Sequence, residues 1–225
     1  MLASEPFFRW NYVTGNWHQI ASDLVQHIEL TLIAVGIGLL ISLPLSLLAW
    51  RYRLARPPVF GMASALYIIP SLALFAILGP ITGYVASYTT AEFALVGYTL
   101  LILTWNTVAG LNAVPDDARQ AARAMGSPGS ALVKVDFPLA LPYVFAGLRV
   151  ATSTVIGLVT VTALIGLGGL GQLITYGFNA QYYTPILVGL VLSVALAAMA
   201  DLLLVLIERV ALPWARSGRR VRRAS

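Results

Sequence analysis

Long apolar runs separated by short polar connections make up most of the chain. Five of these runs reach the roughly 20 residues that an α-helix needs to cross a lipid bilayer. They span approximately residues 28–50, 59–79, 93–111, 141–164 and 184–207. Glycine and proline recur inside them, which is common in membrane helices and destabilising in soluble ones. The pattern predicts an all-α integral membrane protein with five transmembrane helices.

The amino-acid composition also indicates a membrane protein. Of 225 residues, 59% are apolar and 10% are charged, and the mean hydropathy is +0.83. So few charged residues cannot cover the water-facing surface of a soluble enzyme. The chain has no cysteine, which excludes a disulfide framework and a thiolate metal site.

The basic residues alternate between connections and thereby predict the orientation. Arginine and lysine occur in the first connection (51–58), in the third (112–140) and after the last run, whereas the second and fourth connections contain none. The positive-inside rule therefore places the N-terminus outside and the C-terminus in the cytoplasm. Residues 1–27, with Trp10 and Trp17, are expected to rest at the outer membrane interface. The basic tail 211–225 is expected to lie on anionic lipid rather than on nucleic acid.

The sequence of the third connection, residues 112–140, predicts ordered structure. Pro115 and two aspartates supply a turn and a favourable helix start. Residues 118–125 then favour a helix that ends at Gly126, and residues 130–137 favour a second short helix before Pro138. One interpretation is a plain re-entry hairpin. The other is an insert for a partner's groove, because the Ala121/Ala122 face is small and flanked by arginines.

This connection resembles the EAA loop of the membrane subunits of ATP-binding-cassette (ABC) importers. Gln120 stands where that family has glutamate, and the spacer after Gly126 is one residue shorter than the family's. The residues that carry the resemblance are Gln120, Ala121, Ala122, Gly126, Val135, Phe137 and Pro138. The likeness implies a type I ABC importer permease (MetI-like) architecture, with permease domain 28–210 and a cytoplasmic coupling helix inside the loop 112–140. The ATPase contacts that it implies are Gln120, Ala121, Ala122, Met125, Gly126 and Pro138.

Further segments are similar to permeases of the glycine betaine/choline (osmoprotectant) uptake group. They are residues 69–74, 106–110, 139–142, 146–149 and 165–171. Methionine-type permeases share the last segment, so a methionine-type or other small-solute importer remains the alternative, and a stand-alone channel or secondary transporter is more remote. The resemblance implies ATP-driven alternating access for quaternary ammonium compounds such as glycine betaine or choline.

Partners follow from the same resemblance. It implies two cytoplasmic ATP-binding subunits, a second permease (a copy or a related chain) and an extracytoplasmic substrate-binding protein, all at a bacterial plasma (inner) membrane. The chain has no nucleotide-hydrolysis site of its own, because its single lysine, Lys134, follows Val133 and so cannot complete a P-loop. The resemblance implies that this chain performs no bond-making chemistry. ATP and Mg²⁺ are therefore expected on the partner ATPase, and no cofactor on this chain.

Two segments are candidates for the pathway. Pro70 leaves a backbone carbonyl without its helical partner, so Pro70 and Ser71 are expected at a bend beside the substrate. Asn106 is a further pathway candidate, as a polar residue inside an apolar run. The second segment, residues 166–171, matches the dinucleotide fingerprint but follows a membrane run rather than a strand. Its glycines either shape the external mouth of the pathway or simply pack helices; they are Gly166, Gly168 and Gly169.

Charges inside apolar runs are costly and need partners. Arg149 and Asp201 lie at matched depth in the fourth and fifth runs, which predicts an ion pair facing the bundle interior. This pair is either a fixed structural contact or a latch that changes partner between states. His18 and His27 are expected to be interfacial polar residues, and no metal site is expected.

Overall fold

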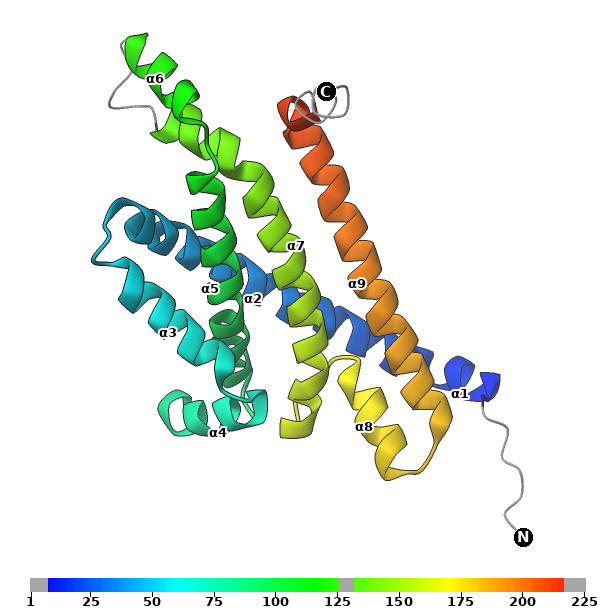
Figure 1. The fold of residues 1–225 in the computed structure, drawn as a ribbon. Coiled ribbons are helices and arrows are strands. Elements are labelled where there is room, and N and C mark those ends of the chain that lie inside the picture. The colour runs from blue at the N-terminus through cyan, green and yellow to red at the C-terminus, as the bar shows by residue number, and fades with distance from the viewer. Residues whose placement is uncertain (1–7, 126–131, 217–225) are drawn as a thin grey trace.

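The computed structural model describes residues 8–125 and 132–216, and all regular elements in these ranges are helical (Figure 1). The helices are α1 (Trp10–Gly15), α2 (Trp17–Arg51), α3 (Arg56–Ile68), α4 (Ser71–Thr82), α5 (Tyr88–Asn112), α6 (Asp116–Ala124), α7 (Phe137–Thr162), α8 (Gly171–Asn179) and α9 (Tyr183–Ala211). Shorter helical turns are η1 (Leu132–Asp136), η2 (Ala163–Ile165) and η3 (Pro213–Arg216). The expected all-α fold is confirmed.

Within the described ranges, four helical stretches are long and apolar enough to cross a membrane: α2, α5, Lys134–Ile165 and α9. The predicted second span over residues 59–79 is divided at Pro70, where a bend was expected. There α3 and α4 meet at an angle of 108°, so a fifth span exists only if this bent pair counts as one. The cause is local: Pro70 has no N–H to donate, and the preceding Ile69 takes an extended conformation (ψ 126°).

The break between α3 and α4 is held by a side chain from α5. The hydroxyl of Tyr98 donates a hydrogen bond to the carbonyl of Ile69. Tyr98 is buried beside Leu74 and Phe75 of α4. The carbonyl at the break is therefore satisfied, and the bend is fixed against the central helix.

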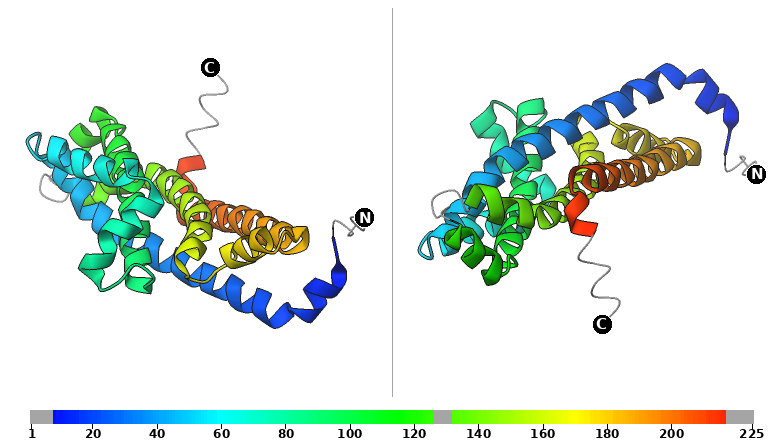
Figure 2. Two further views of the ribbon diagram at one scale, coloured as in Figure 1. Left: turned by 90° about the horizontal axis from the view of Figure 1, so that it is seen from below. Right: turned by 90° about the horizontal axis from the view of Figure 1, so that it is seen from above.

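The first long helix begins at Trp17 rather than near residue 28. Ile20, Asp23 and His27 are buried along one face of its early turns. This spacing is helical, so the polar lead-in packs against the bundle instead of lying wholly at the interface. Seen from below and from above, the N-terminal part of α2 runs alongside α8 and α9 (Figure 2), where Ile20 packs with Leu170 and Leu173.

The core lies where α2 crosses α5 and α7. Leu30 and Ala34 of α2 pack with Leu95 of α5 and with Val155 and Val159 of α7. By contrast, the buried residues of α9 all fall in its first half, between Thr184 and Ser193. α9 contacts α7 and α8, and its later turns are largely exposed in the isolated chain (Figure 1).

Candidate functional site

The expected coupling helix is α6, which begins two residues earlier than the pattern predicts. Pro115 precedes it in an extended conformation, Asp116 and Asp117 occupy the first turn, and Arg123 occupies the last. Acidic residues near the N-terminus of a helix and basic residues near its C-terminus interact favourably with the helix dipole, so this short helix is stabilised by its own sequence. The expected second helix is the π-helical turn η1, which leads directly into α7.

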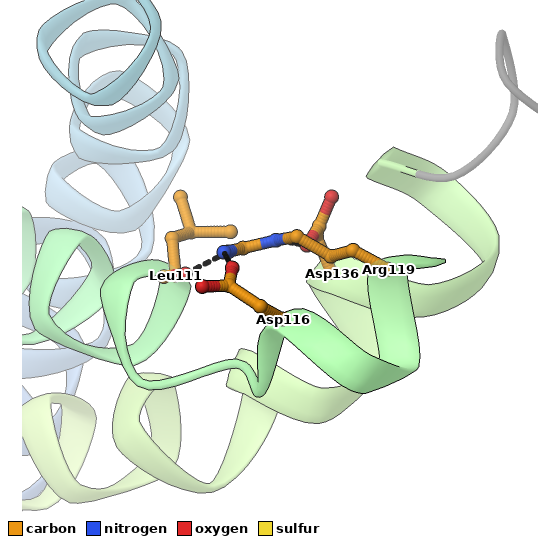
Figure 3. A network of polar contacts seen from close by, with 4 residues as sticks. All are labelled: Leu111, Asp116, Arg119 and Asp136. Atoms are coloured by element: carbon orange, nitrogen blue, oxygen red, sulfur yellow. Dashed lines mark hydrogen bonds and ion pairs between the residues drawn. The ribbon is translucent and has the colours of Figure 1, made fainter. Parts of the chain in front are cut away.

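One arginine fastens α6 to the membrane helices (Figure 3). Arg119 donates from Nε to Oδ1 of Asp136 at 2.7 Å and from Nη2 to the carbonyl of Leu111 at 2.6 Å. It also donates from Nη1 to Oδ1 of Asp116 at 3.2 Å. Its guanidinium lies 5.7 Å from the centroid of the Trp50 ring. We call these five residues the Arg119 cluster.

The Arg119 cluster joins α6 to three membrane helices at once. Leu111 is near the end of α5, Asp136 directly precedes α7, and Trp50 is at the end of α2. The side chain of Arg119 is 20% exposed and that of Asp136 is 6% exposed. The hydrogen bond to Asp136 raises the pKa of Arg119 above its ordinary value, so the guanidinium stays charged. α6 is thereby fastened to the ends of α2, α5 and α7.

The expected ATPase contacts divide into an exposed and a buried set. Gln120 and Ala121 are exposed on α6, and Met125, which directly follows α6, is 78% exposed. Ala122 is only 2% exposed, so in the isolated chain its methyl group is buried rather than presented on the surface of α6. Pro138 is half-buried in the first turn of α7. Gly126 lies outside the described residues.

The pathway candidates do not gather into one cluster. Pro70 and Ser71 lie at the α3–α4 break, held to α5 through Tyr98. Asn106 instead donates a hydrogen bond to Ile102 of its own helix at 2.8 Å. It abuts α7, because a Cβ on Gly147 would lie 2.7 Å from the Cβ of Asn106.

The glycine-rich segment between α7 and α8 is fastened to α2. Gly169 donates its N–H to Oε1 of Gln26 at 3.0 Å, and Leu170 donates its N–H to Nδ1 of His27 at 3.2 Å. Gly166 and Gly169 have φ of 81° and 90°, which L side chains rarely adopt. A Cβ on Gly168 would lie 1.2 Å from Oε1 of Gln26. The segment is a tightly held turn.

His27 is the site residue that sequence reasoning placed wrongly. It is 0% exposed, not interfacial. Because Nδ1 accepts from Leu170, Nε2 carries the proton and donates to the carbonyl of Ile156 at 3.0 Å. The ring thus joins α2, α7 and the start of α8. The available signal was the helical spacing of Ile20, Asp23 and His27.

Arg149 and Asp201 form an ion pair between α7 and α9. Nε of Arg149 donates to Oδ1 of Asp201 at 2.6 Å, and Nη2 donates to Oδ2 at 2.9 Å. Their side chains are 37% and 38% exposed, so in the isolated chain the pair opens on a groove rather than facing a closed interior. Within 8–125 and 132–216, no three His, Asp or Glu side chains are grouped as metal ligands would be.

Comparisons with known proteins cover nearly the whole chain. The family described as binding-protein-dependent transport system inner membrane component matches residues 29–211. The chain is 34% identical over 198 residues to the osmoprotectant import permease protein OsmW of Salmonella typhimurium, across 86% of this chain and 92% of that protein. It is 31% identical to the glycine betaine/carnitine/choline transport system permease protein OpuCB of Bacillus subtilis, across 92% of this chain and 95% of that protein.

Among solved structures, the fold is similar to a chain of the inward-facing MetNI methionine ABC transporter. The TM-score is 0.73 at 24% identity, over 92% of this chain and 99% of that chain. At this identity the likeness shows the fold alone.

Proposed function

This chain belongs to the family of inner membrane components of binding-protein-dependent transport systems, and we propose that it is the permease subunit of an ABC importer for quaternary ammonium osmoprotectants. One observation carries the proposal: the chain matches permeases named for osmoprotectant, glycine betaine, carnitine and choline transport along nearly its whole length. Methionine import remains the alternative, since the solved neighbour shares the fold.

The proposed assembly places two cytoplasmic ATP-binding subunits, a second permease and an extracytoplasmic binding protein around this chain. The exposed face of α6, with Gln120, Ala121 and Met125, supports ATPase docking, because it projects from one end of the bundle (Figure 1). The same end holds the last turns of α9, and α4 and α8 lie at the opposite end. This arrangement agrees with the proposed orientation, in which the N-terminus is outside and the C-terminus is cytoplasmic.

In the proposed mechanism, movement of the ATPase subunits is converted into movement of the membrane helices. ATP and Mg²⁺ act on the partner ATPases, whose closure displaces α6. The Arg119 cluster passes this displacement to α2, α5 and α7, because Trp50, Leu111 and Asp136 lie at their cytoplasmic ends in the proposed orientation. The Tyr98 contact keeps the α3–α4 break attached to α5, so the bend moves with that helix. Alternating access then results from tilting of these connected helices.

Uptake by intact cells tests this function. Salt-stressed cells that lack the chain should lose ATP-dependent uptake of labelled glycine betaine, choline or carnitine, and a plasmid copy should restore it. Depletion of ATP should stop uptake, whereas dissipation of the proton gradient at constant ATP should leave it intact. Normal betaine, choline and carnitine uptake together with lost methionine uptake would transfer the assignment to the methionine alternative. Uptake that needs the proton gradient but not ATP would contradict an ABC importer.

A further inference from the structure

A groove of about 430 Å³ opens between α7 and α9 around the Arg149–Asp201 pair. It is lined by Ala146, Arg149, Val150, Ser153, Thr154 and Asp201. The α7 residues follow the spacing i, i+3, i+4, i+7 and i+8, so they lie on one helix face, and Asp201 faces them from α9. The groove thus combines a cation, an anion, two hydroxyl groups and two small apolar side chains.

The Arg149–Asp201 pair lies at an unusual depth for charged residues. At 1.5 Å per residue, Arg149 lies about 18 Å along α7 from its start, and Asp201 lies about 15 Å before the end of α9. Both are therefore well inside the membrane-spanning part, where a charge is expensive and normally faces a protein interior or a water-filled pathway. Yet more than a third of each side chain is exposed in the isolated chain. A purely structural pair between two adjacent helices does not require this exposure.

We propose that this groove is a substrate site of the pathway, and that it takes a zwitterion carrying a carboxylate and a methylated ammonium. The proposal rests on the function proposed above and names the substrate form that this chain itself recognises. The guanidinium of Arg149 is a planar fork suited to a carboxylate, and Asp201 is the counter-ion for the ammonium. Ala146 and Val150 offer apolar contact to the methyl groups, and Ser153 and Thr154 offer hydroxyls.

Charge balance explains the preference for a zwitterion. When a zwitterion enters, one ion pair is exchanged for two, and every charge at this depth keeps a partner. A simple cation such as choline has to compete with Arg149 for Asp201, which leaves the guanidinium without its carboxylate. The groove therefore discriminates glycine betaine and carnitine from choline at the membrane subunit.

The test compares two substrates in the same reconstituted complex. Initial uptake rates of glycine betaine and choline are measured in proteoliposomes that contain the ATPases and are supplied with one binding protein. Because the binding protein is constant, its own selectivity cancels when each variant is compared with the wild type. The double variant Arg149→Gln/Asp201→Asn should lower the betaine-to-choline rate ratio about tenfold, as expected when a charge-assisted contact is lost. Arg51→Gln, an exposed arginine at the end of α2, is the matched control and should leave the ratio unchanged.

A second variant keeps the test valid if the double variant fails to assemble. Arg149→Lys preserves the ion pair but not the fork, so it should assemble and still lower the ratio. A wild-type ratio in Arg149→Lys, or an equal fall for both substrates in the double variant, would overturn the inference and leave a structural pair. If the wild-type complex transports neither glycine betaine nor choline, the proposed osmoprotectant function is wrong. This outcome differs from an unchanged betaine-to-choline rate ratio in the variants, which would contradict only the proposed site.

Discussion

Replacement of Arg119 by alanine should abolish coupled transport while the membrane helices remain inserted. The substitution leaves the carboxylate of Asp136 buried at 6% exposure without its cation, and it frees the carbonyl of Leu111. Removing one partner of a buried ion pair typically costs about 3–5 kcal/mol. That cost is concentrated in a short helix with little packing of its own, so α6 should lose its fixed position relative to α2, α5 and α7.

The measurement is uptake and substrate-stimulated ATP hydrolysis in proteoliposomes, with protein abundance checked on a gel. Arg123→Ala is the matched control, because Arg123 is an exposed arginine one turn further along the same helix. It should retain transport. Arg119→Lys keeps the charge but cannot reach all partners of the fork, so it should give intermediate uptake. Full coupled uptake by Arg119→Ala would show that the Arg119 cluster does not transmit the movement of α6.

The second large effect is expected at the start of α8. A Cβ on Gly171 would lie 2.1 Å from the carbonyl oxygen of Thr160 and 2.7 Å from its carbon. These are backbone atoms of α7 and cannot rotate away as a side chain can. Gly171→Ala must therefore separate α8 from α7 and strain the turn that Gln26 and His27 hold. Overpacking usually costs about 1–3 kcal/mol and more where the backbone has to move.

Thermal unfolding of the detergent-purified complex measures this effect. Gly171→Ala should be scarce in the membrane or should melt well below the wild type. Gly157→Ala is the control within α7, because nothing lies within 4 Å of its added methyl group. That variant should melt at the wild-type temperature or above it, since alanine favours a helix more than glycine does. If the two variants melted alike, the close approach of α7 and α8 would be wrong.

Features with local causes could be predicted from the sequence. The apolar runs, the helix at residues 116–124 and the break at Pro70 each follow from a window of neighbouring residues. The Arg149–Asp201 contact could be inferred as well, because two opposite charges at similar depth in apolar helices have few other partners. The angle between α3 and α4 could not be predicted from the sequence, because it depends on where Tyr98 of α5 contacts Ile69.

Contacts between segments that are distant in sequence could not be predicted, because no local sequence pattern indicates them. Arg119 and Asp136 are 17 residues apart, and nothing in their spacing indicates that they meet. His27 and Leu170 are 143 residues apart. The sequence places Ala121 and Ala122 on one small face, but in the structure Ala122 is buried whereas Ala121 is exposed. The side of a helix that faces a partner is a tertiary property.

Docking of the ATPase on the exposed face of α6 can be tested with a single introduced cysteine. The natural chain contains no cysteine, so Ala121→Cys carries the only thiol. Tyr84→Cys, at a residue 67% exposed in the α4–α5 connection, is the control at the opposite end. A water-soluble maleimide should label position 121 in the purified permease and fail to label it once the ATPase subunits are bound, whereas position 84 should be labelled in both states. Equal labelling of position 121 with and without bound ATPase would show that the ATPase does not cover this face of α6.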